Sequence, residues 1–138
     1  VNRQMLGEIV FGDCDELEAL NSILHPRIRG HMVQQITRAQ NDDNVKGAVV
    51  DAAVLFEAGC EDLCTHVVFV DATRELREQR VSSTRGWDKN NWMNREKFQI
   101  SLDKKRALCH YIVDNSSSIS HLYEQVCRLF YQIVHAGD

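Results

Sequence analysis

The sequence predicts an α/β fold in which a parallel sheet is flanked by helices, and two observations support this prediction. Three short apolar runs rich in valine, at residues 47–56, 65–70 and 111–113, are typical of strands that are buried on both faces. Segments with helical spacing of apolar residues lie between and after these runs, which is the alternation expected of parallel sheets. Because sheets commonly contain about five strands, we expect the sheet in this chain to be incomplete.

The residues before the first apolar run predict three helices. Apolar residues recur at helical spacing over residues 3–11, and an aspartate at position 13 or 15 can cap the helix that follows. This second helix is expected to end just before Pro26, because proline is favoured in the first turn of a helix. The third helix then runs to about residue 40, where a turn of asparagine and aspartate residues follows.

The rest of the chain predicts strands that alternate with helices. Glu57-Ala58-Gly59 is expected to end the first strand, and Thr73 can cap the helix after the second strand. Ligands of open parallel sheets bind beyond the carboxyl ends of the strands, so polar residues after each run are candidate binding residues. The expected helices cover residues 73–83, 87–99, 102–108 and about 122–133.

Composition narrows the class of protein. The chain has 138 residues and a formal net charge of −4, which suits one globular domain and argues against nucleic-acid binding. No apolar run approaches the roughly 18 residues of a membrane span, and residues 1–11 lack the features of a signal peptide. We therefore expect a cytoplasmic protein that contacts no membrane, and the sequence leaves its oligomeric state open.

The cysteines predict neither disulfides nor a metal site. Five cysteines form an odd and scattered set, which is not a disulfide framework. Cys60, Cys64 and His66 lie close in sequence, but no second pair of ligands follows at the spacing of a zinc site. We therefore expect buried or idle thiols and no bound metal.

A basic segment interrupts this acidic chain. Residues 74–106 contain ten basic and five acidic residues, so this segment has a formal charge of +5 and the remainder of the chain −9. One interpretation is a site for an anionic ligand. The other is a helix surface on which glutamate and arginine side chains pair with one another. Charge alone does not decide between them.

Six short motifs follow one another through the whole chain. They are RQMLGEIVF at 3–11, LNSILHPRI at 20–28, AVLFEAG at 53–59, VVFVDA at 67–72, a basic stretch with Arg80-Val81, Arg85-Gly86-Trp87, Arg95, Gln99 and Lys105, and YIVDNS at 111–116. In this order and spacing the motifs resemble the dephospho-coenzyme A kinase family. Ala53 and Cys109-His110 depart from the family pattern, which has proline and Ala-Asp at these places.

The resemblance implies a P-loop kinase-like fold and an activity. Kinases of this family transfer the γ-phosphate of ATP, with Mg²⁺, to the ribose 3′-hydroxyl of dephospho-CoA, the last step of coenzyme A biosynthesis. None of the seven glycines here forms GxxxxGK[ST] or GxGxxG, so the chain lacks a phosphate-cradling loop. We therefore expect the 138 residues alone to be inactive and the P-loop to lie outside them.

The resemblance also implies how the chain is organised. The implied parts are a helical CoA-substrate segment at residues 1–45, an α/β core at 46–79 and 107–138, and a lid at 80–106. Trp87 and Trp92 are expected to pack within the lid rather than to stack on a base.

The resemblance assigns phosphate binding to Arg80 and Arg85, which would reach the phosphates when the lid closes. Arginine suits this role because its planar guanidinium can bind phosphate oxygens in pairs. The residues alone leave another interpretation open, in which these arginines only pair with Glu78 or Asp88.

Four further site residues follow from the resemblance. Arg3 and His25 would line the dephospho-CoA site, with Glu57 at the cleft, and Asn115 would lie near the adenine of ATP. Local interpretations remain open for two of them. His25 can instead favour a helix C-terminus through its charge, and Asn115 can be a turn former.

Two alternatives to a working dephospho-CoA kinase remain. One is a truncated homologue that binds CoA-like nucleotides without catalysis. The other is a different P-loop kinase that acts on nucleosides or nucleotides. The LN-x-I-x-HP and FEAG segments favour the dephospho-CoA kinase over this last alternative.

Overall fold

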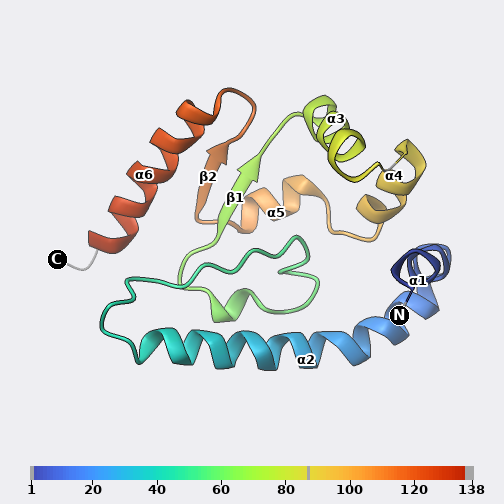
Figure 1. Ribbon diagram of the computed structural model, residues 1–138, viewed down its shortest axis with the longest axis horizontal. Coiled ribbons are helices and arrows are strands. Elements are labelled where there is room, and N and C mark those ends of the chain that lie inside the picture. Colours follow the sequence, from blue (N-terminus) through green and yellow to red (C-terminus); the bar gives the residue numbers. More distant parts are fainter. Residues whose placement is uncertain (1, 87, 136–138) are drawn as a thin grey trace. The chain divides into compact units, whose positions relative to one another are not determined.

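The computed structural model describes residues 2–86 and 88–135 (Figure 1). The chain divides into two units. Unit 1 comprises residues 1–63 and 93–99, and unit 2 comprises residues 64–92 and 100–138. The elements in chain order are α1 (Arg3–Val10), α2 (Cys14–Gln40), the 3-10 turn η1 (Glu61–Leu63), β1 (Val68–Asp71), α3 (Arg74–Arg85), α4 (Lys89–Lys97), α5 (Leu102–Leu108), β2 (Tyr111–Asp114) and α6 (Ile119–His135).

Side-chain caps start both helices of unit 1. The side chain of Asn2 accepts hydrogen bonds from the backbone N–H groups of Gln4 and Met5, at 3.1 and 3.2 Å. Asp13 caps α2 by accepting from the N–H of Asp15 at 2.9 Å, which confirms one of the two predicted caps. These contacts satisfy N–H groups that have no partner inside the helix.

A single helix of 27 residues replaces the second and third predicted helices. The predicted break before Pro26 is wrong, because Pro26 lies inside α2. Proline removes one backbone hydrogen bond of the helix, and α2 nevertheless continues on both sides of Pro26. The side chain of Pro26 is exposed, so its ring displaces no neighbouring element.

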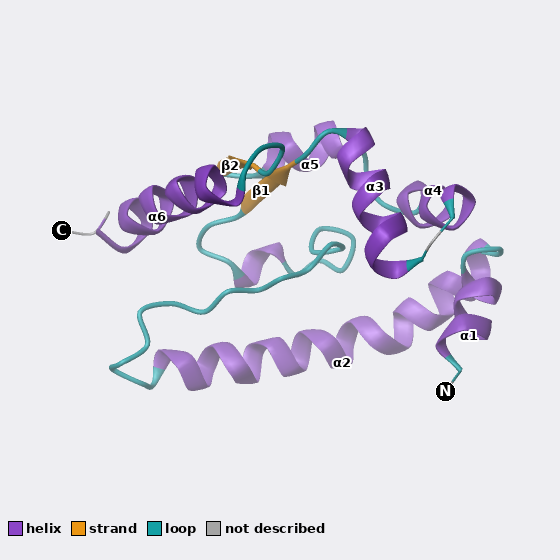
Figure 2. Cartoon of the chain, turned by 45° about the horizontal axis from the view of Figure 1, so that its top comes forward, coloured by secondary structure: helices purple, strands orange, loops and turns teal. Residues whose placement is uncertain are grey.

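The predicted strand at residues 47–56 is also wrong. These residues form a loop that ends in turns, visible as a long teal stretch after α2 (Figure 2). A strand exists only when a neighbour takes up its N–H and C=O groups, and valine-rich composition does not supply that neighbour. Val49 accordingly exposes 96% of its surface.

Two strands form the sheet that the described residues contain. β1 and β2 pair in parallel, in a register that matches Val68 with Tyr111 and Asp71 with Asp114, so the predicted parallel sheet is confirmed. Val113 on β2 is buried, and α6 packs against this strand. The α/β fold class predicted from the sequence therefore holds, with a smaller sheet than expected.

Predicted caps and breaks set the helix boundaries of unit 2. The hydroxyl of Thr73 accepts from the N–H of Leu76 at 3.4 Å and so caps α3. Gly86 ends α3 with a φ of 61°, a left-handed conformation that glycine adopts without strain. Trp87 lies outside the described residues. Within those residues, no helix has both the length and the apolar character that a membrane span requires.

Replacing Val113 with alanine tests the buried face of the sheet. Val113 is 4% exposed, whereas the neighbouring Ile112 is 46% exposed. We expect Val113→Ala to lower the free energy of unfolding by about 2 kcal/mol, through lost burial and a new cavity. Ile112→Ala is the matched control and is expected to cost less than about 1 kcal/mol. Urea unfolding measures both, and equal losses would contradict the assignment of the two faces.

His110 forms a two-point contact with Val67, the residue before β1, and a second variant tests this contact. Its backbone N–H donates to the carbonyl of Val67 at 2.9 Å, and its Nδ1 accepts from the N–H of Val67 at 3.0 Å. His110→Ala leaves this N–H without its acceptor and is expected to cost about 1 kcal/mol. His110→Asp keeps an acceptor and is expected to cost less. Urea midpoints compare the two, and an equal cost would contradict the acceptor role.

Candidate functional site

One face of α2 and one loop residue form an open groove of about 480 Å³ within unit 1. Its lining residues are Cys14, Leu17, Glu18, Asn21, Ser22, His25, Pro26 and Glu57. Most of the helical positions recur every four residues, and residues at this spacing share one face of a helix. The structure thus places His25 and Glu57, two of the predicted substrate residues, in the same groove.

The loop that carries Glu57 folds back on itself through backbone hydrogen bonds. The N–H of Ala58 donates to the carbonyl of Val54 at 2.9 Å, and the N–H of Cys60 donates to the carbonyl of Leu55 at 3.0 Å. Gly59 has a φ of +59°, which favours glycine at this turn. The predicted Glu57-Ala58-Gly59 turn is therefore present, although no strand precedes it.

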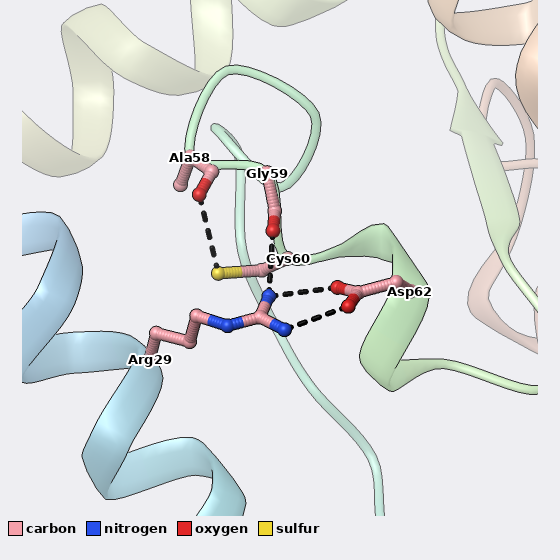
Figure 3. Close-up of polar contacts among 5 residues, drawn as sticks. All are labelled: Arg29, Ala58, Gly59, Cys60 and Asp62. Carbon is pink, nitrogen blue, oxygen red and sulfur yellow. Dashed lines mark hydrogen bonds and ion pairs between the residues drawn. The ribbon is translucent and has the colours of Figure 1, made fainter.

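Arg29 joins α2 to this loop (Figure 3). Its Nη1 donates to the carbonyl of Gly59 and to Oδ1 of Asp62, each at 2.7 Å, and its Nη2 donates to Oδ2 of Asp62 at 2.6 Å. This pairing lowers the pKa of the Asp62 carboxyl, mainly through the hydrogen bonds from Arg29, and raises the pKa of the guanidinium. The geometry is the bidentate pairing that arginine favours with carboxylates.

Sequence reasoning missed Arg29 and Asp62 as residues of this region. Arg29 lies four residues after His25, so helical spacing already placed it one turn from a candidate residue. Asp62 lies 33 residues from Arg29 and carried no comparable signal.

Arg3 does not line the groove. It is the first residue of α1 and is exposed. One turn further along α1, a Cβ on Gly7 would lie 3.3 Å from Nη2 of Arg95, and the guanidinium of Arg95 lies 4.2 Å from the centroid of the Phe11 ring. Glycine at position 7 therefore allows a motif arginine to approach the helix that carries Arg3.

In unit 2, the structure brings Arg80 and Asn115 together. Nη2 of Arg80 donates to the backbone carbonyl of Asn115 at 2.9 Å, while the carboxylate of Glu78 lies 3.9 Å from Nζ of Lys89. The backbone N–H of Asn115 donates to the carbonyl of Asp71 at 2.7 Å. The backbone N–H and C=O of Asn115 thus both form hydrogen bonds at the end of the sheet. Arg85 is the exposed last residue of α3, more than one turn beyond Arg80.

The segment after β2 is held by its own side chains. Oδ1 of Asp114 accepts from the N–H of Ser116 at 2.8 Å, and Ser116 is the main cause that lowers the pKa of the Asp114 carboxyl. Gln125 on α6 donates to the carbonyl of Asp114 at 2.9 Å and accepts from its N–H at 3.0 Å. These contacts fix the direction in which the chain leaves the sheet.

Trp92 occupies the interior next to α3. It is 7% exposed, and the guanidinium groups of Arg74 and Arg77 each lie 5.5 Å from the centroid of its ring. Such cation–π contacts stabilise the packing of an aromatic side chain. Trp92 therefore packs, as expected, and its ring is not displayed for a base to stack on.

No magnesium site can be assigned from these side chains. Within residues 2–86 and 88–135, no three His, Cys, Asp or Glu side chains gather as a metal ion would require. Mg²⁺ in nucleotide sites is commonly held by one or two carboxylates together with water and phosphate oxygens, so its binding with ATP stays a prediction.

The ion pair of Asp62 predicts a pH dependence of stability. Because Arg29 lowers the pKa of the folded carboxyl, the ionised group stabilises the fold above about pH 4, the ordinary range of aspartate, and this is lost as the pH falls through the lower value. Asp62→Asn is thus expected to be slightly less stable than wild type near pH 7, and this difference is expected to shrink as the pH falls from about 4 toward 2.

Urea midpoints of the two proteins across this pH range measure the difference. Asp43→Asn, which changes an exposed aspartate in the turn after α2, is the matched control. A difference between wild type and Asp62→Asn that stays constant down to about pH 2 would contradict the ion pair.

Comparisons with known proteins identify the family. The sequence pattern of the family described as dephospho-CoA kinase matches residues 1–121. A dephospho-CoA kinase from Lactobacillus johnsonii is 32% identical over 133 residues, covering 96% of this chain and 67% of its relative. One from Helicobacter pylori is 35% identical over 130 residues, covering 93% of this chain and 65% of its relative. The chain spans about two thirds of the length of these curated relatives.

Solved structures agree on the fold. The dephospho-CoA kinase from Campylobacter jejuni has a TM-score of 0.65 and 21% identity, over 100% of this chain and 68% of its own. The protein TT1252 from Thermus thermophilus has a TM-score of 0.68 and 24% identity, over 95% of this chain and 66% of its own. With the family pattern matched over most of its length, this chain belongs to the dephospho-CoA kinase family.

Proposed function

We propose that the groove on α2 binds dephospho-CoA as the substrate of an ATP-dependent phosphorylation, and that this transfer also requires a phosphate-cradling loop that the 138 residues do not contain. The observation that carries the proposal is the shared position of His25 and Glu57 in one groove of unit 1. Both residues lie in motifs, LNSILHPRI and AVLFEAG, that resemble the dephospho-CoA kinase family. Family membership supports the substrate, and the groove supports the place where it binds.

The chemistry of the groove suits the uncharged part of the substrate. Glu18 and Glu57 contribute carboxylates, which accept hydrogen bonds from hydroxyl or amide groups and repel phosphates. Asn21 and His25 add further polar contacts beside the apolar side chain of Leu17. We infer that ribose hydroxyls or pantetheine amides of dephospho-CoA lie here, because a diphosphate would face two acids.

We infer that arginine side chains bind the phosphate groups of the substrates. Phosphoryl transfer depends mainly on positioning and on cations that stabilise the moving charge. We assign this role to Arg80 and Arg85 of the proposed lid, residues 80–106, and substrate contact to Arg3. Arg80 already donates one hydrogen bond to a carbonyl. A guanidinium has five N–H donors, so several remain for phosphate oxygens.

We also propose how the chain is divided into a substrate segment and a core. Residues 1–45 form the substrate segment, and residues 46–79 and 107–138 form the core, where Asn115 lies near the adenine. Residues 93–99 of the proposed lid belong to the same unit as residues 1–63. None of the seven glycines forms a phosphate-cradling loop. We therefore expect these 138 residues alone to bind dephospho-CoA without transferring a phosphoryl group.

Glu57→Gln tests the groove. Replacing the carboxylate with an amide weakens one charged hydrogen bond, so we expect the dissociation constant for dephospho-CoA to rise about tenfold. Isothermal titration of the full chain with dephospho-CoA measures this change. Arg38→Gln, a change in the last turn of α2, is the control and is expected to bind like wild type.

Two outcomes would overturn parts of the proposal. A wild-type chain that does not bind dephospho-CoA would refute the substrate site. Binding that Glu57→Gln leaves unchanged would refute the place of the site. Adding ATP to the wild-type complex and analysing the products by mass spectrometry tests transfer, and formation of coenzyme A would refute the expected inactivity of these residues alone.

A further inference from the structure

We propose that Arg29 is a positioning residue for the substrate groove, because it attaches the loop that carries Glu57 to the helix that carries His25. This inference rests on the proposed function only in its consequence for binding. Neither Arg29 nor Asp62 lines the groove, so both act on it through the loop.

The contacts of Arg29 bracket the loop. Arg29 lies one helical turn after His25, so its side chain leaves α2 near the same face. Its three hydrogen bonds reach the carbonyl of Gly59 and both carboxylate oxygens of Asp62 (Figure 3). Gly59 follows Glu57 by two residues, and the two anchor points enclose Cys60. The loop is therefore attached to α2 immediately after its groove residue.

The loop is stiff enough to transmit this attachment. Backbone hydrogen bonds from Ala58 to Val54 and from Cys60 to Leu55, at 2.9 and 3.0 Å, close its turn. Cys60 is 1% exposed, and its Sγ lies 3.5 Å from the carbonyl of Ala58 as a weak donor. A turn closed in this way moves as one piece, so an anchor at Gly59 also sets the position of Glu57.

The ion pair between Arg29 and Asp62 is expected to fix the position of the loop rather than to add much to the free energy of unfolding. The side chains of Arg29 and Asp62 are 37% and 61% exposed. Exposed ion pairs contribute little to global stability because water screens them and two side chains must be ordered. The bidentate geometry nevertheless fixes direction, since lysine cannot offer two parallel donors to a carboxylate and a third to a carbonyl. Losing Arg29 should thus disturb the groove far more than the fold.

Hydrogen–deuterium exchange tests the attachment without any ligand. In Arg29→Lys we expect the amides of Ala58, Gly59 and Cys60 to exchange about tenfold faster than in wild type, because the turn opens more often. Arg38→Gln, an arginine change on the same helix, is the control, and its loop amides are expected to exchange like those of wild type. Unchanged exchange in Arg29→Lys would overturn the inference.

Titration with dephospho-CoA tests the consequence for the groove. We expect Arg29→Lys to raise the dissociation constant about tenfold, since small displacements of a binding group are costly. Its urea midpoint should stay within the range of the Arg38→Gln control, which a merely structural role would not predict. Asp62→Asn should weaken binding in wild type but add little in Arg29→Lys, because both changes break the same contact.

Hydrogen–deuterium exchange and titration with dephospho-CoA distinguish a failure of the positioning role of Arg29 from a failure of the proposed function. Faster loop exchange in Arg29→Lys, together with a wild-type chain that does not bind dephospho-CoA, would refute the proposed function and keep the attachment. Normal dephospho-CoA binding by Arg29→Lys, with tight binding by wild type, would refute the positioning role in the groove.

Discussion

The parallel pairing of β1 with β2 is the constraint on which the polar contacts of unit 2 depend. Parallel strands end at the same edge of a sheet, so Asp71 and Asp114 lie side by side in the register. Arg106 pairs with the carboxylate of Asp71, and the backbone of Asn115 continues the pairing beyond the strand. Arg80 then reaches the carbonyl of Asn115. One edge of the sheet thus gathers residues from four separate segments.

In unit 1, a helix and a turn bring the groove residues together, and no sheet is involved. A single long helix, α2, presents side chains at four-residue spacing, and a closed turn supplies Glu57 opposite them. The turn is attached by Arg29, whose pairing with Asp62 is exposed and contributes more to direction than to stability. The groove residues include two glutamates, Glu18 and Glu57, and no arginine.

Basic side chains of residues 74–106 contact an aromatic ring, a carboxylate and a backbone carbonyl. Arg74 and Arg77 contact the ring of Trp92, and Lys89 lies near Glu78, so part of the positive charge stabilises packing within unit 2. Arg80 bonds a backbone carbonyl and keeps further donors. Pairing of charged side chains within this segment is therefore observed, and binding of an anionic ligand by the segment stays a prediction.

Local signals in the sequence determined the caps at Asp13 and Thr73 and the break at Gly86, because each depends on residues close together in the chain. The alternation of apolar runs with helical segments predicted the α/β class and the parallel pairing, although the paired strands lie far apart in the chain. Motif order predicted His25 and Glu57, which line one groove, and also Arg3, which does not line it. Only the tertiary structure decided that α2 continues through Pro26, that residues 47–56 form a loop, and that Arg29 meets Asp62. These outcomes depend on which distant backbone or side-chain group is available as a partner, and no local pattern encodes that partner.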